Sequence, residues 1–188
     1  MKTTTMSYLG EIMNDIDKEV SELTGRKILD LSQLRKPLDI KQMEFRVGAK
    51  IGNFAQQILA YKNARIDMAR LDSVLGPENW QRCHTKIDGT NFCKVGIKIG
   101  NEWIWKEDAG EESTQHSEKG GASDSFKRAC SNWGIGRELY RLPKIIIRTT
   151  EKIYPQSWKW ESETNDKGYI TELRAFNKDE KITLEFWR

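Results

Sequence analysis

The chain has 188 residues, of which 37% are hydrophobic and 31% charged, enough for one domain with a core but cramped for two. The net charge of +3 is too small to indicate a nucleic-acid binder, so any DNA site must come from a local cluster of cations. No window is apolar enough for a membrane span, and three cysteines are too few for a disulfide framework, so we expect a cytoplasmic protein.

The first predicted element is an amphipathic helix that ends before Gly25. Its apolar residues recur at steps of three and four, which places them on one stripe of a helix. The exposed face is acidic and polar, so we expect a helix that packs on a core or on a neighbouring subunit. The stripe consists of Leu9, Ile12, Met13, Ile16, Val20 and Leu23.

The elements up to residue 75 are also predicted to be mainly helical. Asp39 after Pro37 is typical of a helix cap, and we expect a short helix from there to Val47, with Arg46 at its end. The apolar stretch from 54 to 61 fits either a strand or a helix. A further helical stripe between residues 64 and 75 is closed by a glycine and a proline.

After residue 75 the spacing of apolar residues is no longer helical. In three segments apolar and polar residues alternate, or several apolar residues follow one another. They are separated by Asp-Gly and Gly-Asn dipeptides, which tolerate the positive φ values of tight hairpin turns. The sequence therefore predicts a three-stranded antiparallel meander. Its strands are Trp80–Lys86, Phe92–Ile99 and Trp103–Lys106, and its turns are Asp88-Gly89 and Gly100-Asn101.

After the meander we expect one long helix and then further strands. An acidic connection from Glu107 to Glu112 leads to a helix from Ser117 to Trp133, which stops at Gly134. A short helical turn follows at Arg137–Leu142. The remainder alternates as strands, and Ser162–Gly168 is interpreted as an exposed loop. The clearest strands are Lys144–Thr149, Tyr169–Phe176 and Lys181–Trp187, the last two as a hairpin.

The long helix has two distinct sectors. At 100° per residue, Ala122, Phe126, Ala129, Cys130 and Trp133 share one apolar sector, which should pack on the meander. The opposite sector holds two adjacent cations beside small residues, a surface that suits a phosphate backbone. A solvated face in which Asp124 pairs with Arg128 explains the same spacing. This sector consists of Gly120, Gly121, Asp124, Lys127, Arg128 and Ser131.

The meander interleaves cations with aromatic residues. Such a mixture can hold phosphates and stack bases. Ordinary packing is the more frequent role of strand aromatics, because alternate residues face opposite sides and one side must be buried. The residues are Lys86, Lys94, Lys98 and Lys106 with Phe92, Trp103 and Trp105.

Catalytic chemistry finds little support in the sequence. The carboxylates Glu102, Glu107, Asp108, Glu111 and Glu112 raise the alternative of a metal-dependent nuclease, but they lie largely in one connection, which favours a solvated loop. No phosphate-binding loop occurs, and two histidines leave little choice of general base. We therefore expect no catalytic residue, no metal and no cofactor. Cys83, His84, Cys93, His116 and Cys130 lack the paired spacing of a zinc site.

Three ordered runs give the chain a family resemblance. They are Leu75-Gly76-Pro77-Glu78-Asn79-Trp80, the segment from Trp103-Ile104-Trp105 to Gly110, and the segment from Ala122-Ser123-Asp124 through Lys127-Arg128 to Gly136. Together they resemble the phage Sak-type single-strand annealing proteins, which are relatives of the eukaryotic recombination protein Rad52. The resemblance runs from about Leu34 to Pro143.

This resemblance implies an annealing protein rather than an enzyme. It implies a β-β-β-α core whose subunits form a ring, with single-stranded DNA along a positively charged groove, and complementary strands paired without ATP. An inner DNA site is implied at Arg46, Lys127 and Arg128, and an outer one at Lys98 and Lys119. The long tail through which the eukaryotic proteins bind a recombinase and a single-strand-binding protein has no match in this sequence, so we do not expect mediator activity, and a single-strand-binding protein stays a candidate partner.

We therefore expect an α+β fold: an antiparallel three-stranded meander packed on a long helix, with N-terminal helices and a C-terminal β extension, assembled as a ring-forming homo-oligomer. The expected domains are an N-terminal helical segment (1–33), a single-stranded DNA-binding core (34–143) and a β-rich extension (144–188). The open alternatives are a metal-dependent nuclease and a structural oligomer that ignores DNA.

Overall fold

The computed structural model describes Ile12, Asp15, Ile16, Glu19 and residues 29–110, 117–177 and 181–185, with backbone alone for 117–119 and 181–185. The chain divides into two compact units, Met1–Leu31 and Ser32–Arg188. Of the expected helix that ends before Gly25, only the four residues named first are described, and all four are helical. No described helix is long and apolar enough to cross a membrane.

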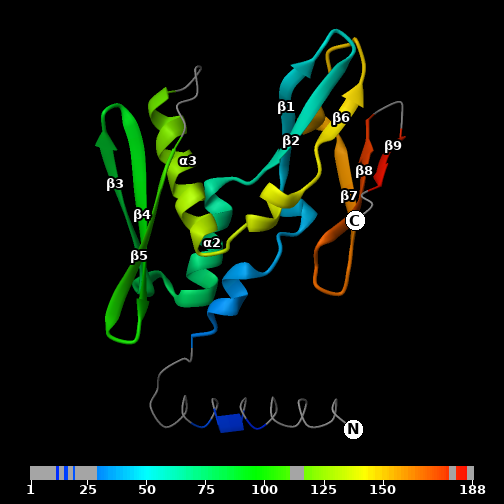
Figure 1. Ribbon diagram of the computed structural model, residues 1–188. Helices are drawn as coiled ribbons and strands as arrows, with labels where there is room; N and C mark the ends of the chain where they lie inside the picture. Colours follow the sequence, from blue (N-terminus) through cyan, green and yellow to red (C-terminus); the bar gives the residue numbers. More distant parts are fainter. Residues whose placement is uncertain are drawn as a thin grey trace. The chain divides into compact units, whose positions relative to one another are not determined.

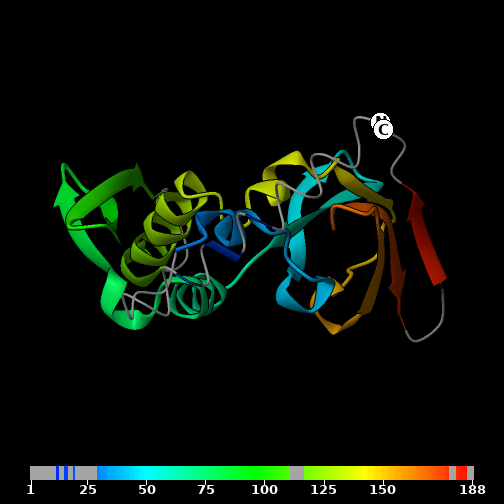
Figure 2. The ribbon, with the colours of Figure 1, turned by 90° about the horizontal axis from the view of Figure 1, so that it is seen from below.

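The meander and the long helix form the expected β-β-β-α core. Strands β3 (Trp80–Ile87), β4 (Thr90–Ile99) and β5 (Glu102–Ala109) pair antiparallel in that order. The turns need positive φ, with values of 47° at Asp88 and 86° at Gly89. Helix α3 (Ser117–Asn132) contacts β4 and β5, and no described helix covers the other face of the meander (Figures 1 and 2).

The apolar sector of α3 packs on the meander as predicted. Phe126, Ala129 and Cys130 are fully buried, and the Trp133 indole donates a hydrogen bond to the carbonyl of Val95, at 3.0 Å. Gly134, at φ 106°, ends the helix. These contacts orient the rest of α3, because a helix buried on one side presents the opposite side outward.

The prediction of a helix from Asp39 to Val47 is wrong beyond its first turn. Asp39 does cap a short 3₁₀ helix, η2 (Ile40–Gln42), whose Gln42 side chain accepts a hydrogen bond from the Asp39 backbone. The chain then extends into β1 (Glu44–Ile51), antiparallel to β2 (Ala55–Tyr61). Burial alternates at the start of β1, because Phe45 is buried between exposed neighbours, and that is the period of a strand. The first 75 residues are therefore not mainly helical.

The strands after α3 complete two further sheets. Following the short helix η4 (Arg137–Arg141), β6 (Ile145–Arg148) pairs with β2, giving the order β1-β2-β6. The third sheet is β7-β8-β9, made of β7 (Lys159–Thr164), β8 (Ile170–Phe176) and β9 (Lys181–Glu185). The expected hairpin of the last two strands is confirmed. The expected loop at Ser162–Gly168 is wrong at its start, where residues up to Thr164 belong to β7.

These two sheets share a hydrophobic core. The Phe45 ring of β1 stacks on the Trp160 indole of β7, with centroids 3.8 Å apart. Figure 2 shows strands of both sheets curving around this core. The core consists of Leu38, Met43, Phe45, Ile58, Ile145, Ile147, Ile170 and Leu173.

Candidate nucleic-acid interface

Lys127 and Arg128 lie outside the buried sector of α3 that holds Phe126, Ala129 and Cys130, as the helical count predicts. Their side chains are 24% and 35% exposed. The Lys127 ammonium lies 3.8 Å from Asp124 Oδ1, and Arg128 Nε lies 3.3 Å from Asp108 Oδ1. Both cations are thus accessible, yet each is oriented by a carboxylate of the chain.

Asp108 is a positioning group for Arg128. Its Oδ1 accepts a hydrogen bond from the Ala109 backbone at 2.8 Å, and its Oδ2 accepts one from the Asn132 side chain at 3.3 Å. Burial lowers the pKa of Arg128, but the hydrogen bond and charge of Asp108 outweigh burial and raise this pKa overall. The guanidinium therefore stays positive, which is the charge state that phosphate binding requires.

The acidic segment that suggested a nuclease does not converge on one point. Glu107 and Asp108 belong to β5 rather than to a connection, and alternate strand residues point to opposite faces. Asp108 faces α3, whereas Glu107 lies 3.6 Å from Lys94 on the other face. Among the described residues, no group of three His, Cys, Asp or Glu side chains is placed to hold a metal ion.

Tyr61 connects Arg46 with Lys127. Arg46 lies on β1, not at the end of a helix, and its exposed guanidinium is 5.8 Å from the centre of the Tyr61 ring. Tyr61, at the end of β2, lines a cavity of about 170 Å³ together with Asp124, Lys127 and Tyr140. Tyr61 therefore lies beside both Arg46 and Lys127, and the third predicted residue, Arg128, follows Lys127 on α3. The sequence reasoning missed both tyrosines, because the fold of segment 54–61 was left open.

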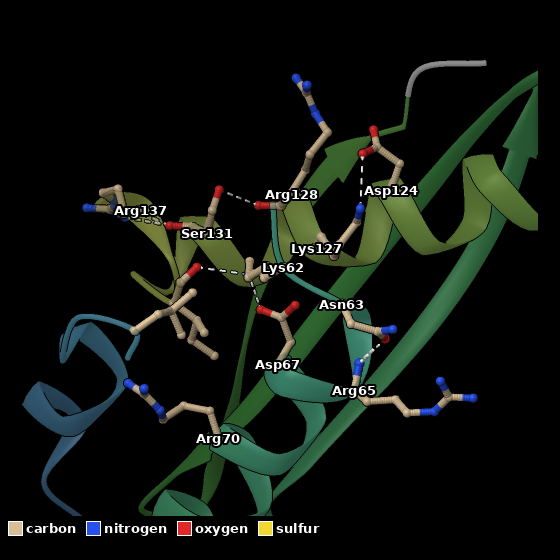
Figure 3. A network of polar contacts seen from close by, with 12 residues as sticks. Lys62, Asn63, Arg65, Asp67, Arg70, Asp124, Lys127, Arg128, Ser131 and Arg137 are labelled. Carbon is tan, nitrogen blue, oxygen red and sulfur yellow. Dashed lines mark hydrogen bonds and ion pairs between the residues drawn. The ribbon is translucent and has the colours of Figure 1, made fainter. Parts of the chain in front are cut away.

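A buried ion pair holds this region together (Figure 3). The Lys62 ammonium contacts Asp67 on α2 (Ala64–Leu75) and donates to the carbonyl of Ile135 at 3.0 Å, with side-chain exposures of 4% for Lys62 and 0% for Asp67. The pair thus joins the end of β2, helix α2 and the turn after α3. Gly136 closes over it, since a Cβ there would lie 2.8 Å from the Lys62 stem. The sequence analysis did not identify this pair.

The buried Asp67 carboxyl has an unpaired oxygen among the described atoms and a raised pKa. Its Oδ2 atom has no hydrogen-bond partner among the described atoms. Burial raises the pKa of Asp67 to about 6, against the opposing pull of the Lys62 charge. The charge of this carboxyl consequently depends on pH in a range in which ordinary aspartates are ionised.

The residues expected to form an outer DNA site do not join this region. Lys98 lies on β4 across from Trp103, on the face of the meander opposite to α3, because Val95 and Ile97 face the helix. The backbone of Lys119 is helical, but its side chain is outside the described set. Trp105, which is 42% exposed, lies on the same face as Lys98 and covers Gly96.

Gly121 is not part of an open surface for a ligand. It is buried, and a Cβ added there would lie 2.5 Å from the Asn91 side-chain nitrogen. Gly121 therefore does not contribute to the surface that was expected to suit a phosphate backbone, because its close neighbour is the start of β4. Packing within the chain explains why a helix here tolerates a glycine.

Sequence comparisons relate the chain to known proteins. A sequence model of the Rad52/22 family double-strand break repair proteins matches residues 30–158. The single-stranded DNA-binding protein DdrA of Deinococcus radiodurans is 36% identical over 89 residues, which cover 46% of this chain and 42% of the relative. DdrA of Deinococcus deserti is 37% identical over 89 residues, covering 46% of this chain and 44% of the relative. The matched region thus spans less than half the length of these curated relatives.

Proposed function

Because the chain belongs to the Rad52/22 family of double-strand break repair proteins, we propose that it binds single-stranded DNA and promotes annealing of complementary strands. The observation that carries this proposal is that Arg46 and Lys127 both lie beside Tyr61, with Arg128 next to Lys127 on α3. The two relatives named as single-stranded DNA-binding proteins support the choice of ligand. DNA recombination and repair is the process that the family description indicates.

The cations act on the phosphate backbone rather than on the bases. Lys127 and Arg128 are held by Asp124 and Asp108 in accessible positions, so little side-chain freedom is lost when a phosphate binds. Contacts with phosphates carry no base information, so binding should be nearly independent of sequence. Bases left facing away from the protein remain free to pair with a complementary strand, and base pairing supplies the free energy without ATP.

The oligomeric ring is part of the same proposal. A single copy of Arg46, Lys127 and Arg128 contacts only a few phosphates, whereas repeated copies along a ring would hold one strand over many nucleotides. Lys98 and Lys119 stay candidates for a second DNA site on such a ring. Native mass spectrometry of the full chain measures the subunit count directly. A single-strand-binding protein is a further candidate partner.

The salt dependence of binding tests the site. We expect Arg128→Ala to make the slope of log affinity against log salt less negative by about 0.7, the value for one phosphate of single-stranded DNA that the protein no longer neutralises. Arg148→Ala is the matched control, because Arg148 is an exposed arginine on β6 outside the site. An unchanged slope and unchanged annealing in Arg128→Ala would contradict the assignment.

The activity itself is tested by annealing labelled complementary oligonucleotides without ATP and with EDTA. We expect acceleration over the spontaneous rate and strands of unchanged length. Strand shortening in magnesium that EDTA abolishes would favour a nuclease instead. A well-folded oligomer that leaves the annealing rate unchanged would favour a purely structural role.

A further inference from the structure

A second group of cations surrounds a small cavity at the end of α3. The cavity measures about 150 Å³ and is lined by Arg35, Gly134, Arg137, Glu138, Arg141 and Tyr169. Arg35 ends the short helix η1 (Leu31–Arg35), and the other two arginines are the first and last residues of η4. Three arginines and one glutamate thus line the cavity.

The packing around the cavity places Arg35 and η4. The stem of Arg35 lies against Gly134, where a Cβ would be 2.7 Å from Arg35 Cγ. Glu138 accepts a hydrogen bond from the Leu38 backbone at 2.7 Å, so its Oε1 is engaged in holding η4 near the start of the β1 segment. The cavity is therefore formed by packed segments that are far apart in the sequence.

The three arginines differ in what they already bind. Arg137 donates to the carbonyls of Ser131, at 2.9 and 3.1 Å, and of Asn132, at 3.1 Å, and therefore caps the end of α3. Arg35 and Arg141 are exposed, and their side chains form no ion pair or hydrogen bond with any residue in the described ranges. No residue that the structure describes therefore occupies the donors of these two guanidinium groups.

The local electrostatics favour an anion in the cavity. Lys106 also donates to the carbonyl of Asn132, at 2.9 Å, which adds a fourth positive charge nearby. Burial and the charges of Arg137 and Arg35 lower the pKa of Lys106, which reflects repulsion within this group of cations. A phosphate would relieve that repulsion, and the planar fork of arginine matches phosphate oxygens in a bidentate way.

The cavity is also connected to the Lys127–Arg128 site. Ser131 lies one helical turn beyond Lys127, and Arg137 folds back onto its carbonyl (Figure 3). Tyr140, the neighbour of Arg141 in η4, lines the cavity that contains Lys127. Burial raises the pKa of Tyr140, and the nearby charge of Arg128 opposes this effect. One short helix therefore adjoins both groups of cations.

We propose that the cavity formed by Arg35, Arg137, Arg141 and Tyr169 binds a backbone phosphate of the same single strand that Lys127 and Arg128 hold. This inference rests on the proposed function and adds a second phosphate-binding site for the same DNA strand. Arg35 and Arg141 contact the phosphate, whereas Arg137 is a positioning residue because its donors already cap α3.

The test uses the full chain and a labelled oligothymidylate at several salt concentrations. For Arg35→Ala/Arg141→Ala we expect the slope of log affinity against log salt to become less negative. The change should be about 0.7 for each phosphate that the variant no longer neutralises. Arg35→Lys/Arg141→Lys should keep the wild-type slope but bind more weakly, because lysine keeps the charge without the bidentate fork. Lys41→Ala/Arg148→Ala is the control, since it removes two exposed cations elsewhere. Native mass spectrometry should give the same subunit count for all variants.

The outcomes separate this inference from the proposed function. A changed slope for Arg35→Ala/Arg141→Ala with an unchanged slope for Arg128→Ala supports the cavity and contradicts the Lys127–Arg128 site. An unchanged slope for Arg35→Ala/Arg141→Ala overturns the cavity assignment alone. Calorimetric titration with inorganic phosphate tests whether the cavity binds free phosphate instead of a DNA phosphate. If Arg35→Ala/Arg141→Ala no longer binds inorganic phosphate but binds DNA as the wild type does, the assignment is also overturned. A folded wild type that binds no oligonucleotide overturns both proposals.

Discussion

Lys62 and Asp67 form a buried pair in which each charge depends on the other. Lys62→Met leaves a carboxylate in the interior without its cation, and we expect a loss of about 3 to 5 kcal/mol in the free energy of unfolding at pH 7. The double variant Lys62→Met/Asp67→Leu should recover most of this loss, because well-packed apolar side chains can replace a buried ion pair. Urea denaturation of both variants measures the difference. A double variant no more stable than the single one would contradict this account.

The raised pKa of Asp67 also predicts a pH dependence of stability. In the folded chain the pKa is about 6, against 3.8 as the ordinary value, so between these values the folded state binds more protons than the unfolded state. The stability contributed by this group is therefore complete below about pH 4 and is lost as the pH rises through about 6. Unfolding free energies from pH 4 to 7, compared with Lys62→Met/Asp67→Leu, isolate the effect. A constant difference across that range would show that the pKa of Asp67 is not raised.

The sequence could predict where the cations Lys127 and Arg128 lie on their helix, but not which carboxylates they contact. Helical geometry alone separates Lys127 and Arg128 from Phe126 and Cys130, because positions on an isolated helix follow from spacing. The partners of the cations did not follow, since Asp108 comes from a strand 20 residues earlier in the chain. Asp124, expected as an alternative partner of Arg128, lies 3.8 Å from Lys127, and its charge also contributes to raising the pKa of Arg128.

Among the elements, the contact between the end of β5 and α3 depends on Gly110. A Cβ at this position would lie 2.3 Å from the carbonyl oxygen of Gly121 and 2.7 Å from the backbone nitrogen of Ser125. Because backbone atoms cannot rotate away, we expect Gly110→Ala to cost about 3 kcal/mol, near the upper end for overpacking.

Gly100→Ala provides the comparison for Gly110→Ala. Gly100 has a φ of 62° and nothing within 4 Å of an added Cβ, so only backbone strain of about 1 kcal/mol is expected. Chemical denaturation of both variants compares the cost of overpacking at Gly110 with the cost of backbone strain at Gly100. An equal or smaller loss for Gly110→Ala would mean that α3 shifts freely on the sheet.

The elements also show which local signals were sufficient. The meander was predictable because its turn dipeptides and its alternating segments indicate the same structure. The segment that became β1 carried competing signals, since Asp39 is a true cap but of only three helical residues. Pairing with β2 and burial of Phe45 favour the extended chain, and both depend on residues distant in sequence. The short strand β7 was interpreted in part as a loop for the same reason.

For the whole molecule, the boundary expected between Pro143 and Lys144 stays a prediction that truncation can test. Ile145, Ile147, Ile170 and Leu173 all lie in the shared core. Removing them forfeits about 6 to 12 kcal/mol at about 1.5 to 3 kcal/mol for each side chain, which is comparable with the whole stability of a domain. We therefore expect a chain that ends at Pro143 to lose cooperative unfolding.

A chain that ends at Asn177 is the control for this truncation. It keeps β6, β7 and β8 and should still unfold cooperatively, although with lower stability because β8 loses its pairing with β9. Thermal denaturation followed by circular dichroism compares the two chains. A cooperative transition in the chain that ends at Pro143 would support an independent core at 34–143.

The β-β-β-α core, the outward position of Lys127 and Arg128, and the family could be predicted from the sequence alone, because turn chemistry, helical spacing and ordered motifs are local properties of the chain. Three features became visible in the folded chain alone: β1 and β2 form a hairpin, Arg46 and Lys127 both lie beside Tyr61, and Lys62 joins Asp67 to the turn after α3. Those contacts join residues from different elements, and their free energy comes from burial and pairing that exist only once the chain has folded.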